Sequence, residues 1–305
     1  MARATVPSPY TDATRPLDAM GTALAVLLCF SWGFNQVAIK LALQDFPPMI
    51  QAALRSGGAT LLVWMWVRAR NISLRIDDGT LWPGIAAGLL FGIEFIFIFS
   101  GLQYTTATRS ALFFYTAPFW VVIGSRLFLP SDRLRPLHWL GLCLSFAGMG
   151  VAFGWPASSG NLSETIGDIL ITLGAAAWAA TTLLVKASSL NRVPPEKTML
   201  YQLVVSFFVL VLAALAFGET MTALPGPVAT GALLYQTVWV VSVTFVIWFM
   251  LVVRYSASRL SAFTFLAPLF GVTAGHLVMG DPVTPAFALA VVLVVGGLIL
   301  VNRPG

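Results

Sequence analysis

Two stretches of the chain carry the same unusual pair of residues, a tryptophan followed eight positions later by a lysine. "SWGFNQVAIK" holds Trp32 and Lys40, and "AWAATTLLVK" holds Trp178 and Lys186. An indole in the middle of an apolar segment either fills a gap between helices or faces a cavity, where it can stack on an aromatic ligand or attract a cation. Because the pair recurs 146 residues apart, we expect Trp32 and Trp178 to face each other across a central cavity. Lys40 and Lys186 then fall at helix ends and are expected to be boundary anchors rather than site residues.

Polar side chains follow each of these tryptophans by about one helical turn. Asn35 and Gln36 follow the first, and Thr181 and Thr182 follow the second. Amide and hydroxyl groups in apolar helices join neighbouring helices through hydrogen bonds, and the same groups can contact a polar ligand. Both interpretations stay open, and Asn35 and Thr182 are the candidates for ligand contact.

Glu94 is the one carboxylate placed deep inside an apolar segment of the sequence. A charge in the middle of a bilayer is costly unless it is paired, solvated or neutralised, so such a residue is a functional candidate by default. We expect Glu94 to bind a ligand ammonium group or to carry a proton. The structural alternative is an ion pair with Arg55, the one cation well inside an apolar segment.

Two prolines occupy equivalent places in two further apolar segments. Pro118 and Pro268 each follow an alanine and lie about half-way along their segment. Proline removes a backbone hydrogen bond and kinks a helix. A symmetric pair of kinks predicts a gating role, with ordinary architecture as the alternative.

The cysteines and histidines predict neither a metal site nor a disulfide. Cys29 and Cys143 both fall inside apolar segments, and His138 and His276 are isolated from each other. Buried cysteines of this kind behave as small hydrophobic residues. We therefore expect no metal, no cofactor and no catalytic residues.

The composition is that of a polytopic membrane protein. Of 305 residues, 58% are hydrophobic and 10% are charged, whereas soluble domains carry about 25% charge. A helix needs about 20 mostly apolar residues to cross the hydrocarbon core. Ten segments qualify, which predicts an all-α integral membrane protein with these spans: 20–43, 48–67, 82–102, 107–128, 137–155, 167–187, 199–217, 231–253, 258–279 and 285–302.

The distribution of Lys and Arg predicts the orientation of these spans. With the N-terminus placed in the cytoplasm, 14 of the 17 basic residues fall at inner ends or inner loops and only two, Lys40 and Arg109, at outer ends. Basic residues stay cytoplasmic, so both termini are expected there. The polar, proline-containing residues 1–19 are expected to form a disordered cytoplasmic tail, and the net charge of +5 reflects topology and gives no sign of nucleic-acid binding.

The chain is predicted to contain two five-helix repeats, residues 20–155 and 167–302. Besides the Trp–Lys pair, a Pro-Pro opens the second and seventh spans, and an Ala-Pro recurs in the fourth and ninth. The offset drifts from 146 to about 150, which we attribute to small loop insertions. Because five is odd, the second repeat must be inverted, as in many transporters. A third-span stripe, Gly84, Gly88 and Gly92, is expected to pack closely against another helix.

These features resemble the drug/metabolite transporter superfamily in its EamA-domain branch, over about residues 20–302. Within that superfamily the pattern is close to that of a bacterial inner-membrane exporter of aromatic amino acids. The resemblance implies a cavity lined by spans 1, 3, 4, 6, 8 and 9, with spans 5 and 10 peripheral. It also implies export of aromatic and other apolar amino acids, including methionine. The positions that match its site are Trp32, Glu94, Tyr115, Trp178 and Trp248.

The predicted function is therefore secondary export of a small metabolite by alternating access. No G-x4-G-K-[ST] loop is present, which argues against ATP drive. Export of a different metabolite or drug is the main alternative. A membrane enzyme is disfavoured because the sequence lacks a His/Asp/Glu cluster, and a channel or sensor is disfavoured by the inverted repeat. The expected partners are the lipid bilayer and the substrate, with protons as a further candidate and a monomer as a plausible assembly.

Overall fold

The computed structural model describes residues 16–129, 132, 134–154, 161–280 and 285–303, and within these ranges it consists of helices and turns. The predicted tail therefore lies mostly outside the described residues. The first half of the chain forms α1 (Ala19–Ala42), α2 (Pro48–Ala69), α3 (Leu81–Leu102), α4 (Ala107–Phe114), α5 (Ala117–Phe128) and α6 (Pro136–Phe153).

The second half repeats this order with more interruptions. Its helices are α7 (Leu162–Ala187), η1 (Ser189–Arg192), α8 (Pro195–Ala216), α9 (Pro227–Leu234), η2 (Tyr235–Thr244), α10 (Phe245–Arg254), α11 (Ala257–Ala262), η3 (Phe263–Phe265), α12 (Leu266–Met279) and α13 (Pro285–Asn302). Here η1 and η3 are short 3₁₀ turns and η2 is a π-helix. The boundaries agree with the predicted spans to within a few residues, except that α7 begins at Leu162, behind an Asn161 cap.

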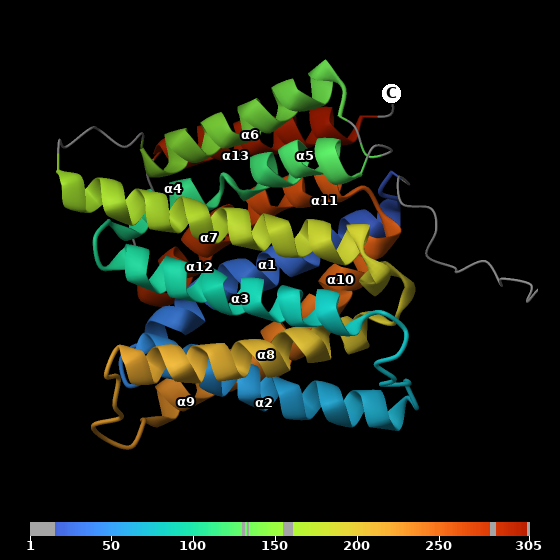
Figure 1. Cartoon of the computed structure of the whole chain (residues 1–305). Helices are drawn as coiled ribbons and strands as arrows, with labels where there is room; N and C mark the ends of the chain where they lie inside the picture. Colours follow the sequence, from blue (N-terminus) through green and yellow to red (C-terminus); the bar gives the residue numbers. More distant parts are fainter. Residues whose placement is uncertain (1–15, 130–131, 133, 155–160, 281–284, 304–305) are drawn as a thin grey trace, which may run out of the picture.

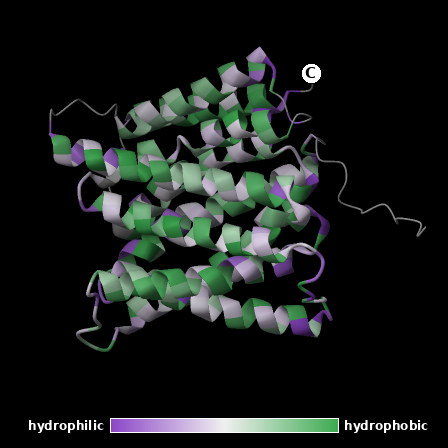
Figure 2. Cartoon of the chain, viewed as in Figure 1, coloured by the Kyte–Doolittle hydropathy of each residue, from purple (hydrophilic) through white to green (hydrophobic). Residues whose placement is uncertain are grey.

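The ten predicted spans are confirmed. Nine helical stretches in the described residues are long and apolar enough to cross a bilayer. The tenth, α2, is less apolar because its buried face carries Gln51, Arg55 and Ser56, and it lies among the other spans in contact with α3 and α8. Figure 2 shows hydrophilic residues gathered mostly at the two ends of the bundle.

The two halves pack as an inverted repeat. The start of α1 and the end of α13 lie at the same end of the bundle (Figure 1), which the distribution of basic residues assigns to the cytoplasm. Equivalent helices pair with each other at the two edges, α6 with α13 and α2 with α8, while α1, α3 and α7 lie between these pairs. Spans 5 and 10, which are α6 and α13, are therefore peripheral.

Small residues set how closely these helices approach. The stripe of Gly84, Gly88 and Gly92 on α3 packs against Tyr201, Val205 and Val209 of α8. Without Cβ atoms, the glycines bring α3 close enough for van der Waals contact, which drives helix association where lipid removes the hydrophobic effect.

The α6–α13 pair is packed in the same way. A Cβ added to Gly141 would lie 2.5 Å from the Gly297 carbonyl oxygen, and one added to Gly297 would lie 2.4 Å from that of Gly141. Neither position has room for a side chain, so these glycines fix the separation of the two outer helices.

The drift in repeat offset arises inside span 8, which corrects the expected loop insertions. The span from Pro227 to Arg254 has 28 residues, whereas its counterpart α3 has 22. The wider turns of η2 take up part of this difference, and π-helical turns often mark functional sites. Within η2, the Ser242 hydroxyl donates to the carbonyl of Thr237, five residues earlier, at 2.7 Å.

Both proline-containing spans are interrupted at the expected places, although the geometry is a break rather than a kink within one helix. In span 4, α4 ends at Phe114 and α5 begins at Ala117, with Pro118 in its first turn. In span 9, the 3₁₀ turn η3 separates α11 from α12, and Pro268 is the third residue of α12. A proline in the first turn of a helix loses no hydrogen bond, which explains how the chain accommodates both residues.

The two ends of the bundle differ although the halves are related by symmetry. At the inner end α11 packs against α5, and α10 packs against α7. In the described residues the equivalent outer pairs, α4 with α12 and α1 with α3, have marginal contact at most. The inner seam is also joined by hydrogen bonds, because the Ser125 and Ser258 hydroxyls lie 2.7 Å apart and Asp132 accepts from the Ser258 N–H at 3.2 Å. The structure is therefore closed on the inner side.

An ion pair secures the inner loop between α2 and α3. Lys197, in the first turn of α8, lies 2.5 Å from the Asp78 carboxylate, and the Thr80 hydroxyl and backbone N–H also donate to Asp78. Partial burial opposes ionisation, but the Lys197 and Thr80 hydrogen bonds together lower the pKa of Asp78 to about 2. This carboxylate is therefore ionised at neutral pH, and the loop stays attached to α8.

The glycine stripe predicts a specific sensitivity of the α3–α8 contact. An added Cβ on Gly88 would lie 2.4 Å from the Val205 Cβ, so Gly88→Ala should lower the stability of the detergent-solubilised protein by about 1–3 kcal/mol through overpacking. Gly231→Ala is the matched control, because Gly231 is helical with open space around it. The control should be neutral or slightly stabilising. Equal thermal unfolding of the two variants would contradict this packing.

Candidate functional site

Three tryptophans meet at the centre of the bundle. Trp248 of α10 is 2% exposed, and its ring lies 5.3 Å from that of Trp32 on α1 and 5.3 Å from that of Trp178 on α7, measured between centroids. Such separations and tilted geometries are favourable for aromatic pairs. The expectation that Trp32 and Trp178 face each other across a central cavity is therefore corrected, because Trp248 lies between them and both indoles contact it.

The π-helix holds this aromatic stack in position. The Trp32 indole N–H donates to the Thr244 hydroxyl at 2.9 Å, and that hydroxyl donates to the Val240 carbonyl oxygen at 2.5 Å. Phe245, the next residue, packs against Trp32 and against Phe91 of α3 at 5.7 Å each. The end of η2 thereby links the signature tryptophan of the first repeat to the second repeat.

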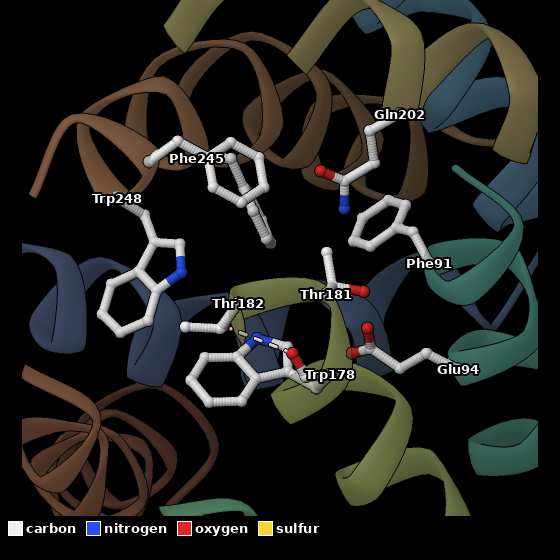
Figure 3. Close-up of a pocket in the computed structure, with 9 residues that line it drawn as sticks. Phe91, Glu94, Trp178, Thr181, Thr182, Gln202, Phe245 and Trp248 are labelled. Atoms are coloured by element: carbon white, nitrogen blue, oxygen red, sulfur yellow. Dashed lines mark hydrogen bonds between the residues drawn. The ribbon is translucent and has the colours of Figure 1, made fainter. Parts of the chain in front are cut away.

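A small pocket lies beside Trp178 and Trp248 (Figure 3). Its cavity volume is about 10 Å³, close to what a single water molecule needs and far below the usual range of about 300–1,000 Å³ for ligand pockets. Five of its nine lining residues are aromatic, and the other four are polar. It is lined by Phe91, Glu94, Trp178, Thr181, Thr182, Gln202, Phe245, Trp248 and Phe249.

Glu94 supplies the one carboxylate of this pocket. It lies near the middle of α3, is 4% exposed, and its Oε2 atom has no hydrogen-bond partner in the described part of the chain. Figure 3 shows the carboxylate turned toward Thr181 and Trp178. A buried oxygen without a partner is costly, and Oε2 is free to accept a hydrogen bond from a ligand or a water molecule.

The alternative of a direct ion pair between Glu94 and Arg55 is not observed in the described residues. Both side chains are 4% exposed and they interact electrostatically, but they form no contact at ion-pair distance. The Arg55 guanidinium lies over the ring of Phe95, 4.3 Å from its centroid, and its Nε and Nη2 atoms have no partner there. An acidic and a basic side chain are thus buried near each other without direct contact.

The two threonines after Trp178 also line the pocket. Thr181 and Thr182 each donate to the carbonyl oxygen four residues earlier, that of Ala177 at 3.1 Å and of Trp178 at 3.2 Å. Their hydroxyl protons are therefore occupied by their own helix, while their oxygen lone pairs stay available to a ligand donor.

Other predicted site residues lie outside this pocket. Asn35 is 8% exposed, and its Oδ1 atom has no partner among the described residues. Tyr115 is buried at the end of α4, where it packs against Phe114. Pro118 and Pro268 mark the interruptions of spans 4 and 9 described above. None of these four is among the residues that line the pocket.

The two repeated lysines differ, which corrects the expectation that both are boundary anchors. Lys40 is exposed at the outer end of α1, as expected. Lys186, however, is 3% exposed, and its ammonium group donates to the carbonyl oxygens of Val252, at 2.8 Å, and Tyr255. It therefore joins α7 to the end of α10 inside the protein.

Sequence reasoning missed several residues of the site. Gln202 could have been found, because it stands 147 residues after Arg55 and the Pro-Pro pairs share this offset. Phe91, Thr244 and Phe245 had no such signal. Their positions depend on the π-helix and on side-chain packing, which periodicity does not reveal.

A ten-span bundle of two inverted repeats, with polar groups at a central aromatic pocket, defines a membrane transport protein. The model of the EamA-like transporter family matches residues 19–154 and 165–303. The chain therefore belongs to the EamA-like transporter family, which is a family of transporters and not of enzymes.

Relatives agree with this assignment. An uncharacterized transporter, YvbV, of Bacillus subtilis is 28% identical over 92% of both chains. The uncharacterized inner membrane transporter YedA of Escherichia coli is 24% identical over 89% of this chain and 87% of its own. A probable amino-acid metabolite efflux pump of Salmonella typhimurium is 24% identical over 90% of this chain and 92% of its own. A solved structure, covering 92% of this chain and 97% of its own with a TM-score of 0.80, shares the fold at 22% identity.

The aromatic stack predicts a large effect at Trp248. Trp248→Ala removes the ring that both other indoles contact, and should lower the stability of the solubilised protein by about 3–5 kcal/mol. Trp82→Ala is the control, because Trp82 is 76% exposed at the start of α3, and it should change stability by less than about 0.5 kcal/mol. Denaturant or thermal unfolding measures both, and a small loss at Trp248 would mean that the stack is not a structural centre.

Proposed function

We propose that this protein is a secondary exporter of small apolar amino acids, chiefly aromatic amino acids and methionine. It works by alternating access around the pocket at Trp178, Trp248 and Glu94. The observation that carries the proposal is a buried carboxylate oxygen without a hydrogen-bond partner among the described residues, set in an aromatic wall at the middle of the membrane. Membership in a transporter family and the similarity to a probable amino-acid metabolite efflux pump support it.

The pocket chemistry suits a zwitterion with an apolar side chain. Indole and phenyl rings stabilise aromatic and thioether groups by stacking and by sulfur–aromatic contact. Glu94 is assigned to the ammonium group of the substrate, assisted by the Thr182 oxygen and by the faces of Trp178 and Trp248, which attract cations. Trp32 positions Trp248, and Asn35 is assigned to the substrate path along α1.

Phosphorylated substrates fit poorly, because such groups require several cations. In the described spans, Arg55 is the single buried cation near the pocket, and the Lys186 ammonium is already bonded to two carbonyl oxygens. A lipophilic amine is the second candidate, since an unpartnered carboxylate oxygen among aromatic rings suits an organic cation equally well.

The interruptions of spans 4 and 9 are assigned to gating. Breaks in a helix provide points where a few residues absorb large backbone changes. Pro118 and Pro268 occupy the same place in each inverted repeat, and Tyr115 lies beside the first break. We assign these breaks to the movement that opens one end while the other closes. The protein is assigned to the bacterial inner membrane, as a monomer.

Counterflow in proteoliposomes tests the proposal. Vesicles loaded with unlabelled phenylalanine should accumulate labelled phenylalanine or methionine in a saturable way, because exchange through one site needs no other energy source. Glu94→Gln should weaken exchange of amino acids by about tenfold or more if the carboxylate binds the ammonium group, since a charge-assisted bond contributes about 1.5–3 kcal/mol.

The same variant separates the two roles of Glu94. If the carboxylate carries protons, Glu94→Gln should also abolish the dependence of transport on an imposed pH gradient. An unchanged gradient dependence would exclude proton coupling through Glu94. Absence of exchange with every amino acid, together with exchange of an aromatic amine, would replace the leading proposal by the second.

A further inference from the structure

Two polar residues at the pocket occupy equivalent positions in the two repeats. The inference about substrate recognition drawn from them rests on the proposed function. Arg55 on α2 and Gln202 on α8 occupy equivalent positions, 147 residues apart, on helices that pack against each other. Arg55 is 4% exposed and Gln202 is 1% exposed. Two donor atoms of Arg55, Nε and Nη2, have no partner in the described ranges. Gln202 keeps its acceptor Oε1 without a partner there, and its amide nitrogen, the donor that a carboxylate requires, is turned toward Thr181 (Figure 3).

Gln202 lines the pocket, whereas Arg55 lies outside the lining, behind the ring of Phe95. Figure 3 shows the Gln202 amide between Phe245 and Phe91, on the opposite side of Thr181 from Glu94. Arg55 stacks on Phe95, which contacts Phe91 at 5.0 Å, edge to face. A ligand in this pocket therefore has a negative group at one end and an amide backed by a positive group at the other.

We propose that Gln202 and Arg55 form a carboxylate subsite, which makes this transporter select amino acids over the corresponding amines. Guanidinium groups bind carboxylates with paired, directional hydrogen bonds, and two donor atoms of Arg55 are unused within the described residues. The ammonium group of a zwitterion is then assigned to Glu94, and its carboxylate group to Arg55 and Gln202. Binding also supplies partners to atoms of Glu94 and Arg55 that have none within the described residues.

Binding of phenylalanine and of phenethylamine, which lacks the carboxylate, tests this subsite. Tryptophan fluorescence of the purified protein reports on binding, because Trp178 and Trp248 line the pocket. The wild-type protein should prefer phenylalanine by about tenfold or more. Arg55→Gln should remove this preference, while Arg68→Gln, on the exposed end of the same helix, should retain it.

The possible results distinguish failure of the subsite from failure of the proposed function. Retention of the preference in Arg55→Gln overturns the subsite, and equal binding of both probes by the wild-type protein does so as well. If Arg55→Gln does not fold, Gln202→Leu gives the same comparison, and an unchanged preference there overturns the subsite. Binding of neither probe by the folded wild-type protein overturns the proposed function itself.

The repeated lysines carry a second inference, which is independent of the substrate. Lys186 is buried against the carbonyl end of α10, where unpaired carbonyls concentrate negative charge. Lys40, its repeat counterpart, is exposed and has no hydrogen-bond or ion-pair partner in the described part of the chain. Two tyrosines that occupy equivalent positions near these helix ends differ in burial in the same way. Tyr255, at the inner end, is 2% exposed, and its counterpart Tyr104, at the outer end, is 45% exposed.

The geometry points to an exchange of lysines between the two states of the transport cycle. When the outer end closes, Lys40 takes the place at α3 that Lys186 takes at α10, with the carbonyl oxygens of Gly101 and Tyr104 as its acceptors. Lys186 is then released from the inner end. The assignment follows from inverted symmetry, since two equivalent halves reach the opposite state by exchanging conformations, and the inner end is the closed one in this structure.

Cross-linking at the inner seam tests the exchange. Ser125 and Ser258 come from different halves, and their hydroxyl oxygens lie 2.7 Å apart, so cysteines placed at both positions should form a disulfide only when the inner end is closed. The pair is introduced after Cys29→Ala and Cys143→Ala. Lys186→Met should slow disulfide formation about tenfold, which corresponds to about 1.4 kcal/mol.

The double variant separates exchange from anchoring. If Lys40 stabilises the opposite state, adding Lys40→Met to Lys186→Met should return the cross-linking rate toward that of the parent. If Lys40 is only a boundary anchor, the double variant will cross-link as slowly as Lys186→Met, which overturns the exchange. Should Lys186→Met fail to fold, Lys40→Met alone must slow substrate counterflow, and unchanged counterflow overturns the exchange.

Discussion

Hydrogen-bonding groups that enter the hydrocarbon core must find partners inside the protein, and this constraint shapes the whole bundle. It explains why the chain is helical throughout its spans and why the breaks in spans 4 and 9 lie among other helices. The hydroxyl of Thr116 donates to the Phe113 carbonyl oxygen at the first break, at 2.6 Å. Lys186 satisfies carbonyls at the end of α10 in the same way.

Because of this constraint, buried polar atoms without hydrogen-bond partners point to places where a ligand can bind. In the described residues, Glu94, Arg55 and Gln202 keep polar atoms without hydrogen bonds, and all three lie in or beside one central region. Other buried side chains of the described chain also keep an atom without a partner, namely Asn35, Gln51, Ser56, Thr198 and Asn302, whereas Asp132 and Asp168 are satisfied. Glu94, Arg55 and Gln202 differ from these because they gather at one aromatic pocket, where a ligand can supply the missing partners.

Much of the architecture was predictable from the sequence because it depends on periodic patterns. Span length, the bias of basic residues and the recurring Trp, Pro-Pro and Ala-Pro positions were enough to predict ten spans and an inverted repeat. The glycine stripe on α3 correctly predicted a close contact, but not its partner α8. The π-helix was not predictable, because its residues are as apolar as those of an ordinary helix. For the same reason the position of Trp248 between Trp32 and Trp178 was missed.

The sequence also did not predict that the inner end is the closed one. Two inverted halves with nearly equal patterns are compatible with either state, and only side-chain contacts such as those of Lys186 and Tyr255 distinguish the ends. Lys186 itself was assigned to the membrane boundary because its distance from Trp178 places it near the end of α7. Its burial depends on α10 and the turn after it, which no local pattern could indicate.

The most direct test of the central claim is whether substrate occupies the pocket at Glu94. Dicyclohexylcarbodiimide modifies protonated carboxyl groups in apolar surroundings, and mass spectrometry of peptides can locate the modified residue. We predict modification at Glu94 and its saturable suppression by phenylalanine, with no suppression by a sugar used as a control. Modification of Glu94 at the same rate with and without every amino acid that the protein exchanges would contradict occupancy of this pocket by the substrate.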